Sequence, residues 1–165
     1  MDPVADALGF ALYFEGAAGP AEAEVEAKLI FDKRLSNALL AANLVGAHEW
    51  QFGEETGREI ELEVDLAAGL FLSDAFMLGV ELRNQIDLEN GNEFESSAFF
   101  GGPVVAYAQP TWWTALTILP QFAAIKRKGD EIEPGPVVPE PDDSALDLHE
   151  HERVEVRLLV GFHLR

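Results

Sequence analysis

The feature that most constrains the fold is a strict two-residue alternation of acidic and aliphatic side chains. The segment from Arg58 to Leu72 reads REIELEVDLAAGLFL, with acids at every second position from Glu59 to Asp65 and aliphatic residues between them. Because an extended strand sends successive side chains to opposite faces, this segment has one acidic and one apolar face. Two architectures accommodate such a strand: a soluble barrel with its apolar face inside, or a membrane barrel with that face outside.

The same alternation continues through most of the chain and predicts eight strands. We expect them at residues 8–16, 22–32, 38–52, 58–72, 76–87, 98–108, 112–125 and 153–164. Strands in soluble sheets usually have about five or six residues, whereas a tilted membrane strand needs about 9–11, and most of these segments reach that length. The second, fourth and sixth connectors are tight and the others are longer or richer in glycine and acid. This asymmetry is typical of outer-membrane barrels and predicts periplasmic termini.

Length and composition narrow the class of protein. The chain has 165 residues, 48% of them hydrophobic, which favours one folded barrel domain over residues 1–165 with a long acidic, proline-rich loop at 126–152. The longest uncharged run, Ser96 to Ile125, is interrupted by glycine and proline and fails as a membrane helix. The opening MDPVADALGF lacks the basic start and apolar centre of a secretory signal. A formal charge of -19 argues against a nucleic-acid partner and leaves no basic patch for anionic lipid headgroups.

The two faces of the predicted strands differ in the size and charge of their side chains. The apolar face carries bulky residues and excludes charge, as a lipid-facing surface does. The opposite face mixes charged residues with many glycines and alanines, which suits a crowded or water-containing interior. The side chains that we predict to face this interior are Glu24, Glu26, Lys28, Glu49, Glu59, Glu61, Glu63, Asp65, Glu81, Arg83, Arg153, Glu155 and Arg157.

Five aromatic residues fall near predicted strand ends: Trp50, Phe52, Tyr107, Trp112 and Trp113. Amphipathic rings prefer the boundary between hydrocarbon and headgroups, so we predict an interfacial girdle there. The alternative is that aromatic residues simply favour strands.

The acidic ladder from Glu59 to Asp65 has two interpretations. Carboxylates about 7 Å apart along one face would attract cations into a pore. In a barrel of only eight strands the same groups, paired with the lysine and arginines of that face, more readily form a structural network that fills the interior.

Few motifs point to chemistry. His149 and His151 form one H-x-H in an acidic loop, for which a solvated loop is the simpler interpretation than a metal site. No hydrolase, phosphate-loop, zinc-protease or dinucleotide motif occurs in the chain. We therefore expect no metal, no cofactor and no catalytic activity. Pro103 and Pro120 fall within predicted strands, where each removes a ladder hydrogen bond, so we expect bulges or strand ends there.

The final stretch, RVEVRLLVGFHLR, resembles the closing strand of bacterial outer-membrane β-barrels. Apolar residues alternate from Val156 to Leu164, although Leu164 stands where an aromatic residue is usual and Arg165 follows it. The resemblance implies a porin-like or transporter-like barrel in the outer membrane of a Gram-negative bacterium, or the C-terminal portion of a larger one. It also implies that barrel-insertion machinery recognises this strand, and that small solutes or cations are the other partners besides the bilayer.

Two rivals to this outer-membrane barrel stay open. One is a soluble lipocalin-like barrel that binds a small apolar ligand inside and shows its acids to water. The other is an enzyme built on an outer-membrane barrel.

Overall fold

The structure is a computed structural model that describes residues 8–52, 56–90, 93–126, 146 and 151–162. It confirms an all-β chain of eight antiparallel strands in up-and-down order. The strands are β1 (Gly9–Ala18), β2 (Glu22–Leu35), β3 (Ala38–Gln51), β4 (Gly57–Phe71), β5 (Phe76–Glu89), β6 (Glu93–Ala108), β7 (Trp112–Lys126) and β8 (Val154–Phe162). Most of the predicted loop at 126–152, including His149, lies outside the described residues. No helix in the described segments is long and apolar enough to cross a membrane.

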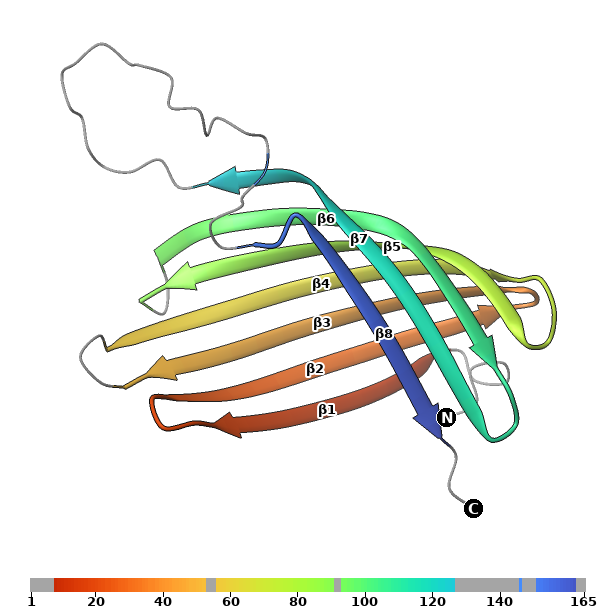
Figure 1. Cartoon of the computed structure of the whole chain (residues 1–165), viewed down its shortest axis with the longest axis horizontal. Helices are drawn as coiled ribbons and strands as arrows, with labels where there is room; N and C mark the ends of the chain where they lie inside the picture. Colours follow the sequence, from red (N-terminus) through yellow and green to blue (C-terminus); the bar gives the residue numbers. More distant parts are fainter. Residues whose placement is uncertain (1–7, 53–55, 91–92, 127–145, 147–150, 163–165) are drawn as a thin grey trace, which may run out of the picture.

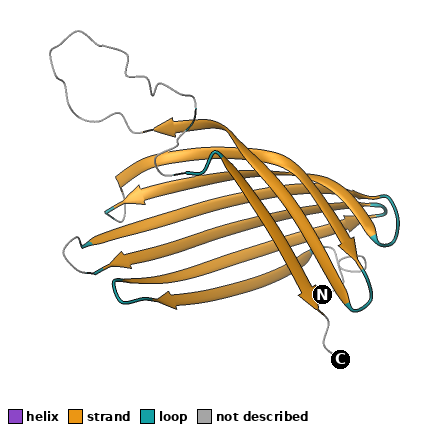
Figure 2. Cartoon of the chain, viewed as in Figure 1, coloured by secondary structure: helices purple, strands orange, loops and turns teal. Residues whose placement is uncertain are grey.

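The strands form a single, strongly curved sheet, a half-barrel (Figure 1). Each strand pairs with its neighbours in sequence, so that β1 and β8 are the two edges of the sheet in the part of the chain that is described. The connections alternate between the two ends of the sheet (Figure 2). β7 and β8 run at a steep angle to β1–β4, and the sheet curls over (Figure 1). We call the concave side of this curled sheet the hollow.

Strand register divides the side chains into an inner face, toward the hollow, and an outer face. The pairing of β1 through β5 runs without a shift, so each face continues unbroken across these five strands. The inner face holds Asp65 and Arg83, which are only 4% and 7% exposed. The outer face holds Leu66 and Val80, which are 52% and 59% exposed. The apolar side of the alternation therefore points outward and the acidic side points into the hollow.

β6 begins five residues earlier than the pattern predicts. A bulge shifts the β5–β6 register between Asp87 and Leu88, whose partners are Ser96 and Phe94. The extra residue resets which face each position occupies. A strict two-residue period is therefore lost between Glu93 and Ala98, and the sequence pattern alone assigned that segment to a loop.

Both strand prolines lie where the ladder between β6 and β7 is broken. Partners are paired at Phe100–Gln121 and again at Val104–Thr117, but not in the segment between them, which contains Pro103. Pro120 itself forms the last pair of β7 with β8. This confirms the expected irregularity at the prolines, since a residue without an N–H cannot complete the ladder.

Few apolar side chains are buried in the interior of the half-barrel. Ala98, Phe100 and Leu119 form a compact buried cluster on β6 and β7. Most other buried side chains are polar or charged. The half-barrel is therefore held together by its strand ladders and by polar contacts across the hollow.

Candidate functional site: a polar network across the hollow

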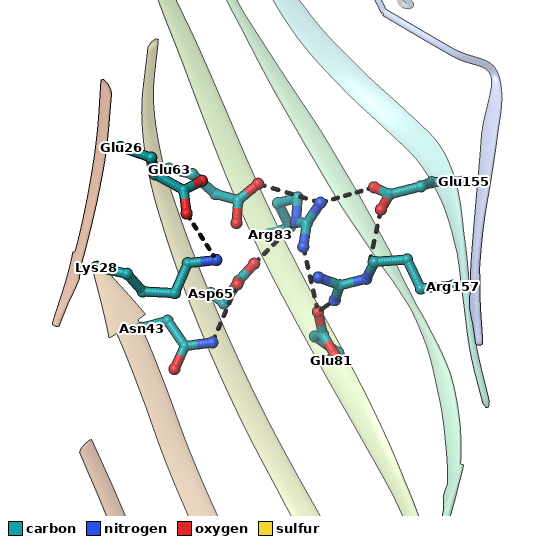
Figure 3. Close-up of polar contacts among 9 residues, drawn as sticks. All are labelled: Glu26, Lys28, Asn43, Glu63, Asp65, Glu81, Arg83, Glu155 and Arg157. Atoms are coloured by element: carbon teal, nitrogen blue, oxygen red, sulfur yellow. Dashed lines mark hydrogen bonds and ion pairs between the residues drawn. The ribbon is translucent and has the colours of Figure 1, made fainter. Parts of the chain in front are cut away.

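Arg83, on β5, is the centre of a network of ion pairs on the inner face (Figure 3). Its Nε lies 2.8 Å from Oδ1 of Asp65, and its Nη1 lies 3.1 Å from Oε2 of Glu63, both on the neighbouring strand β4. The same Nη1 lies 2.7 Å from Oε2 of Glu155 on β8. The planar guanidinium can serve several carboxylates at once, because its five N–H donors point in fixed directions.

Arg157 on β8 extends the network back to β5. Its guanidinium donates to Glu81, and its Nε lies 3.3 Å from Oε1 of Glu155. Glu81 also lies 3.8 Å from Nη2 of Arg83. β8 is therefore joined to β5 twice across the hollow, although β6 and β7 separate these strands in the sheet.

The network contains more acid than base. Its four carboxylates, Glu63, Asp65, Glu81 and Glu155, surround two guanidinium groups. Three of the four carboxylates are buried, as is Arg83. Ion pairs withdrawn from water are costly to break, because each partner is left buried and uncompensated.

Two further polar contacts lie along the inner face toward β2, one within the network and one beside it. Asn43 on β3 donates from Nδ2 to Oδ2 of Asp65 at 3.2 Å. Lys28 on β2 pairs with Glu26 of its own strand, Nζ to Oε1, at 3.5 Å (Figure 3). Of the four basic residues predicted to face the interior, Arg83 and Arg157 contact the acids of the network. Lys28 pairs with Glu26 beside the network, and Arg153 is exposed before the start of β8.

A second acidic feature lies nearer one end of the sheet. Strand register places Glu24, Glu49, Glu59 and Glu89 side by side across β2 to β5, and we call this row the acidic rim. Like charges in directly opposed positions repel one another. The rim lies at the end where β3 connects to β4, which is the end predicted to face the cell exterior.

The sequence pattern missed a buried cluster of histidine, aspartate and serine. His151, just before β8, lies with Nε2 2.8 Å from Oδ2 of Asp87 and 3.1 Å from Oγ of Ser96. Ser96 also donates to the same Asp87 oxygen at 3.0 Å. His151 is buried, whereas the sequence favoured a solvated loop. Both partners contact one ring nitrogen, whereas a Ser-His-Asp catalytic triad uses the two nitrogens separately. These contacts join the segment before β8 to strands β5 and β6, and we call the cluster of His151, Asp87 and Ser96 the latch.

A pocket of about 290 Å³ lies beside the network. Its lining includes Glu61, Glu63 and Arg83 from the predicted interior set, together with His151 and Phe100. The described residues contain no group of histidines, cysteines and acids arranged to hold a metal ion.

A comparison with known families matches residues 3–164 of the chain to DUF6662, a family of unknown function. The chain belongs to this family. No curated protein and no solved structure matches it.

In this DUF6662 member the predicted aromatic residues separate onto two faces. Trp50, Tyr107 and Trp112 lie on the outer face near strand ends, and the rings of Tyr107 and Trp112 are 5.7 Å apart. Trp113 lies on the inner face and covers Gly161 of β8, where an added Cβ would collide with the indole. Trp112 and Trp113 are separated in this way because adjacent residues of a strand point to opposite faces of the sheet.

Proposed function

We propose that this chain forms an outer-membrane β-barrel of a Gram-negative bacterium, and that its interior is filled by the Arg83 network rather than open as a wide pore. The observation that carries the proposal is a distribution of apolar and charged side chains opposite to that of an ordinary globular protein. Large aliphatic and aromatic side chains are exposed over the outer face, while carboxylates and Arg83 are buried in the hollow. Exposed apolar surface on this scale marks contact with a membrane or a partner.

Two polar side chains in the apolar outer band, Asn84 and Thr114, are hydrogen-bonded within the sheet, which supports a lipid environment. Asn84 donates to Oγ of Ser97 at 2.7 Å and to the carbonyl of Ala98 at 3.1 Å. Thr114 donates to the carbonyl of Leu159 at 2.9 Å. Hydrocarbon offers no hydrogen bonds, so polar groups that face it must be satisfied within the protein.

A bilayer also requires the two edges of the half-barrel to be closed, because unpaired backbone groups are not tolerated in lipid. We propose that β8 pairs with β1 of the same chain. An even number of up-and-down strands makes these edges antiparallel, and the ion pairs that join β5 to β8 show how strongly the sheet curves. Such strong curvature between strands three apart fits an eight-stranded barrel better than one of sixteen strands built from two copies.

The closure can be tested by disulfide trapping, since the chain contains no cysteine. Leu12→Cys on β1 is combined in turn with Leu158→Cys, Val160→Cys and Phe162→Cys on β8. We expect one pair to form an intramolecular disulfide in vesicles, visible as a monomer with shifted migration on a non-reducing gel. A disulfide-linked dimer instead would mean that a second copy closes the sheet.

The membrane location can be tested by labelling single cysteines with a charged, water-soluble thiol reagent. Leu158 is 66% exposed in the structure, so Leu158→Cys reacts readily if the chain is soluble. We expect this cysteine to be protected in vesicles and Thr56→Cys, in the connection from β3 to β4, to react. A chain that stays in the aqueous phase without detergent, and labels equally at both positions, contradicts the proposal. It would favour the soluble, lipocalin-like rival, although that rival needs an apolar hollow for its ligand.

A narrow cation-selective passage is the second candidate, and the acidic rim is the observation that favours it. Rings of carboxylates at a mouth concentrate cations. Planar-bilayer recordings distinguish the two candidates: a filled barrel gives no steady conductance, and the combined change Arg83→Ser and Glu155→Ser should open one. If the unmodified chain conducts with a preference for cations, neutralising Glu61, Glu63 and Glu81 should weaken that preference.

The last strand would also serve as the signal for assembly. β8 ends with Phe162 on the outer face, 72% exposed and next to the undescribed residues 163–165. We propose that the barrel-insertion machinery binds this strand. Phe162→Ala should then slow insertion into vesicles that contain the machinery, with no effect on insertion into lipid alone.

A further inference from the structure

We propose that Arg58, together with Trp50, forms a binding site on the outer face for the anionic, phosphate-bearing headgroup of a membrane lipid. The inference rests on the proposed membrane location of the barrel. It concerns the end of the apolar outer face beside the β3–β4 connection, and not the polar network of the hollow.

Arg58 is unusual in its position. Across β1 to β5, where register is unshifted, the only charged side chains on the outer face of the described strands are Lys33 and Arg58. Both are cations in a chain with 30 acids and 11 lysines and arginines. They lie at opposite ends of the strands, where a long basic side chain can reach the headgroups while its stem stays in the apolar band.

Arg58 lies in a concave site on the outer face, whose lining is suited to bind a phosphate group. A concave site of about 450 Å³ is lined by Arg58, Thr56 and Asn90, which can donate hydrogen bonds, and by the rings of Trp50 and Phe52. No acid is found among the described residues that line it, whereas acids line the pocket beside Arg83 and another between β1 and β3. Among the described residues Arg58 has neutral donors beside it and no carboxylate partner, and such an arginine is suited to a phosphate oxygen.

Trp50 is held in place for such a role. It is the direct strand partner of Arg58 in the β3–β4 ladder. His48 stacks on its ring with centroids 4.1 Å apart and an interplanar angle of 18°. A tryptophan fixed at the end of an apolar band lies where the first part of an acyl chain meets its headgroup. The ring would contact the lipid tail while Arg58 binds the phosphate.

The site can be tested by lipid-selective quenching of Trp50. The chain has three tryptophans, and Trp112 and Trp113 lie at the other end of the sheet, so Trp112→Phe with Trp113→Phe leaves Trp50 as the only reporter. Its fluorescence is measured in bilayers that contain phosphatidylglycerol or phosphatidylcholine with brominated acyl chains. We expect phosphatidylglycerol to be preferred about fivefold, the ratio that corresponds to about 1 kcal/mol for one basic residue near an anionic surface.

Matched variants locate the preference. Arg58→Gln should reduce the ratio to one, and Lys33→Gln, at the opposite end of the strands, should leave it unchanged. An excess of inorganic phosphate should also leave it unchanged, and its loss on adding phosphate would mean a site for a free ion and would overturn the lipid site. Equal quenching by both lipids, or an unchanged ratio in Arg58→Gln, overturns the site and leaves the membrane barrel intact. No quenching by either lipid means that Trp50 does not face a bilayer, and this overturns the proposed function itself.

If the chain with one tryptophan does not fold, native mass spectrometry provides the same comparison. Lipid adducts retained by the unmodified chain are compared with those of Arg58→Gln in mixtures of the two lipids. Preferential retention of phosphatidylglycerol that depends on Arg58 supports the site, and equal retention overturns it.

Discussion

Arg83 on β5 and Glu155 on β8 meet across the hollow, with Nη1 and Oε2 2.7 Å apart, although two strands lie between them in the sheet. An open, flat sheet could not bring these residues together. The contact therefore reports the curvature of the half-barrel. It also places a buried guanidinium in the middle of the hollow.

Loss of Arg83 should destabilise the fold more than loss of any exposed arginine. Arg83→Met leaves Asp65 and Glu63 buried without their cation, at an expected cost of about 3–5 kcal/mol in the free energy of unfolding. Arg153→Met is the matched control, since Arg153 is exposed and should change stability by no more than about 0.5 kcal/mol. Equilibrium unfolding by urea in micelles or vesicles measures both. Equal stabilities would mean that the network is not a structural element.

A charge at the middle of the outer face should be much more costly than one at its end. Leu66 and Leu35 are 52% and 51% exposed, so in water the substitutions Leu66→Arg and Leu35→Arg should have similar, small effects. In a bilayer, Leu66→Arg near the centre of β4 should cost about 2–4 kcal/mol and Leu35→Arg at the end of β2 about 0–1 kcal/mol. Unfolding free energies in vesicles test the difference. Similar values for the two variants would argue for a soluble barrel.

Close backbone approach explains one glycine at the broken β6–β7 ladder. A Cβ on Gly102 would collide with the carbonyl of Ile118, whereas one on Gly46 would make an ordinary contact with Leu62. Gly102→Ala should therefore destabilise the protein by about 1–3 kcal/mol. Gly46→Ala should be neutral or stabilising by about 0.5–1 kcal/mol, because alanine loses less backbone entropy in a strand. Thermal or urea unfolding of the two variants provides the comparison, and a neutral Gly102→Ala would contradict the close approach.

Repulsion within the acidic rim should be measurable through its dependence on salt. Glu59 lies in register between Glu49 and Glu89, so Glu59→Gln should raise stability at low salt by about 0.5 kcal/mol. The gain should fall toward zero in concentrated salt, because the Debye length shortens to about 3 Å at 1 M. Urea unfolding at two salt concentrations measures this. A gain that does not change with salt would indicate a cause other than charge.

The latch before β8 should be structural. His151→Ala removes the partner of Asp87 and Ser96 within a buried cluster, with an expected loss of about 1–3 kcal/mol. Glu152→Ala, at the exposed neighbouring position, is the control and should be close to neutral. Unfolding measurements compare the two variants. A hydrolytic activity that His151→Ala abolishes without changing stability would restore the enzyme hypothesis.

The alternation in the sequence determined the number of strands, their order and the face of most side chains. That information is local, since a period of two requires only an extended backbone. It failed where the backbone departs from this period: the bulge between Asp87 and Leu88 changed which residues around Ser96 point inward. A bulge is decided by the pairing of two strands, so the sequence of one strand does not reveal it.

The contacts of the candidate site depend on the curvature of the sheet. No short segment of the sequence encodes this curvature by itself. Sequence alone placed Arg83 and Glu155 on one face; the rolled sheet decided that they touch, and that His151 is buried on Asp87. The proximity of Arg58 to Trp50 follows instead from the β3–β4 register, which makes the two residues direct strand partners. Side-chain direction follows from covalent geometry at each residue, whereas contacts between distant strands follow from twist summed over the whole sheet.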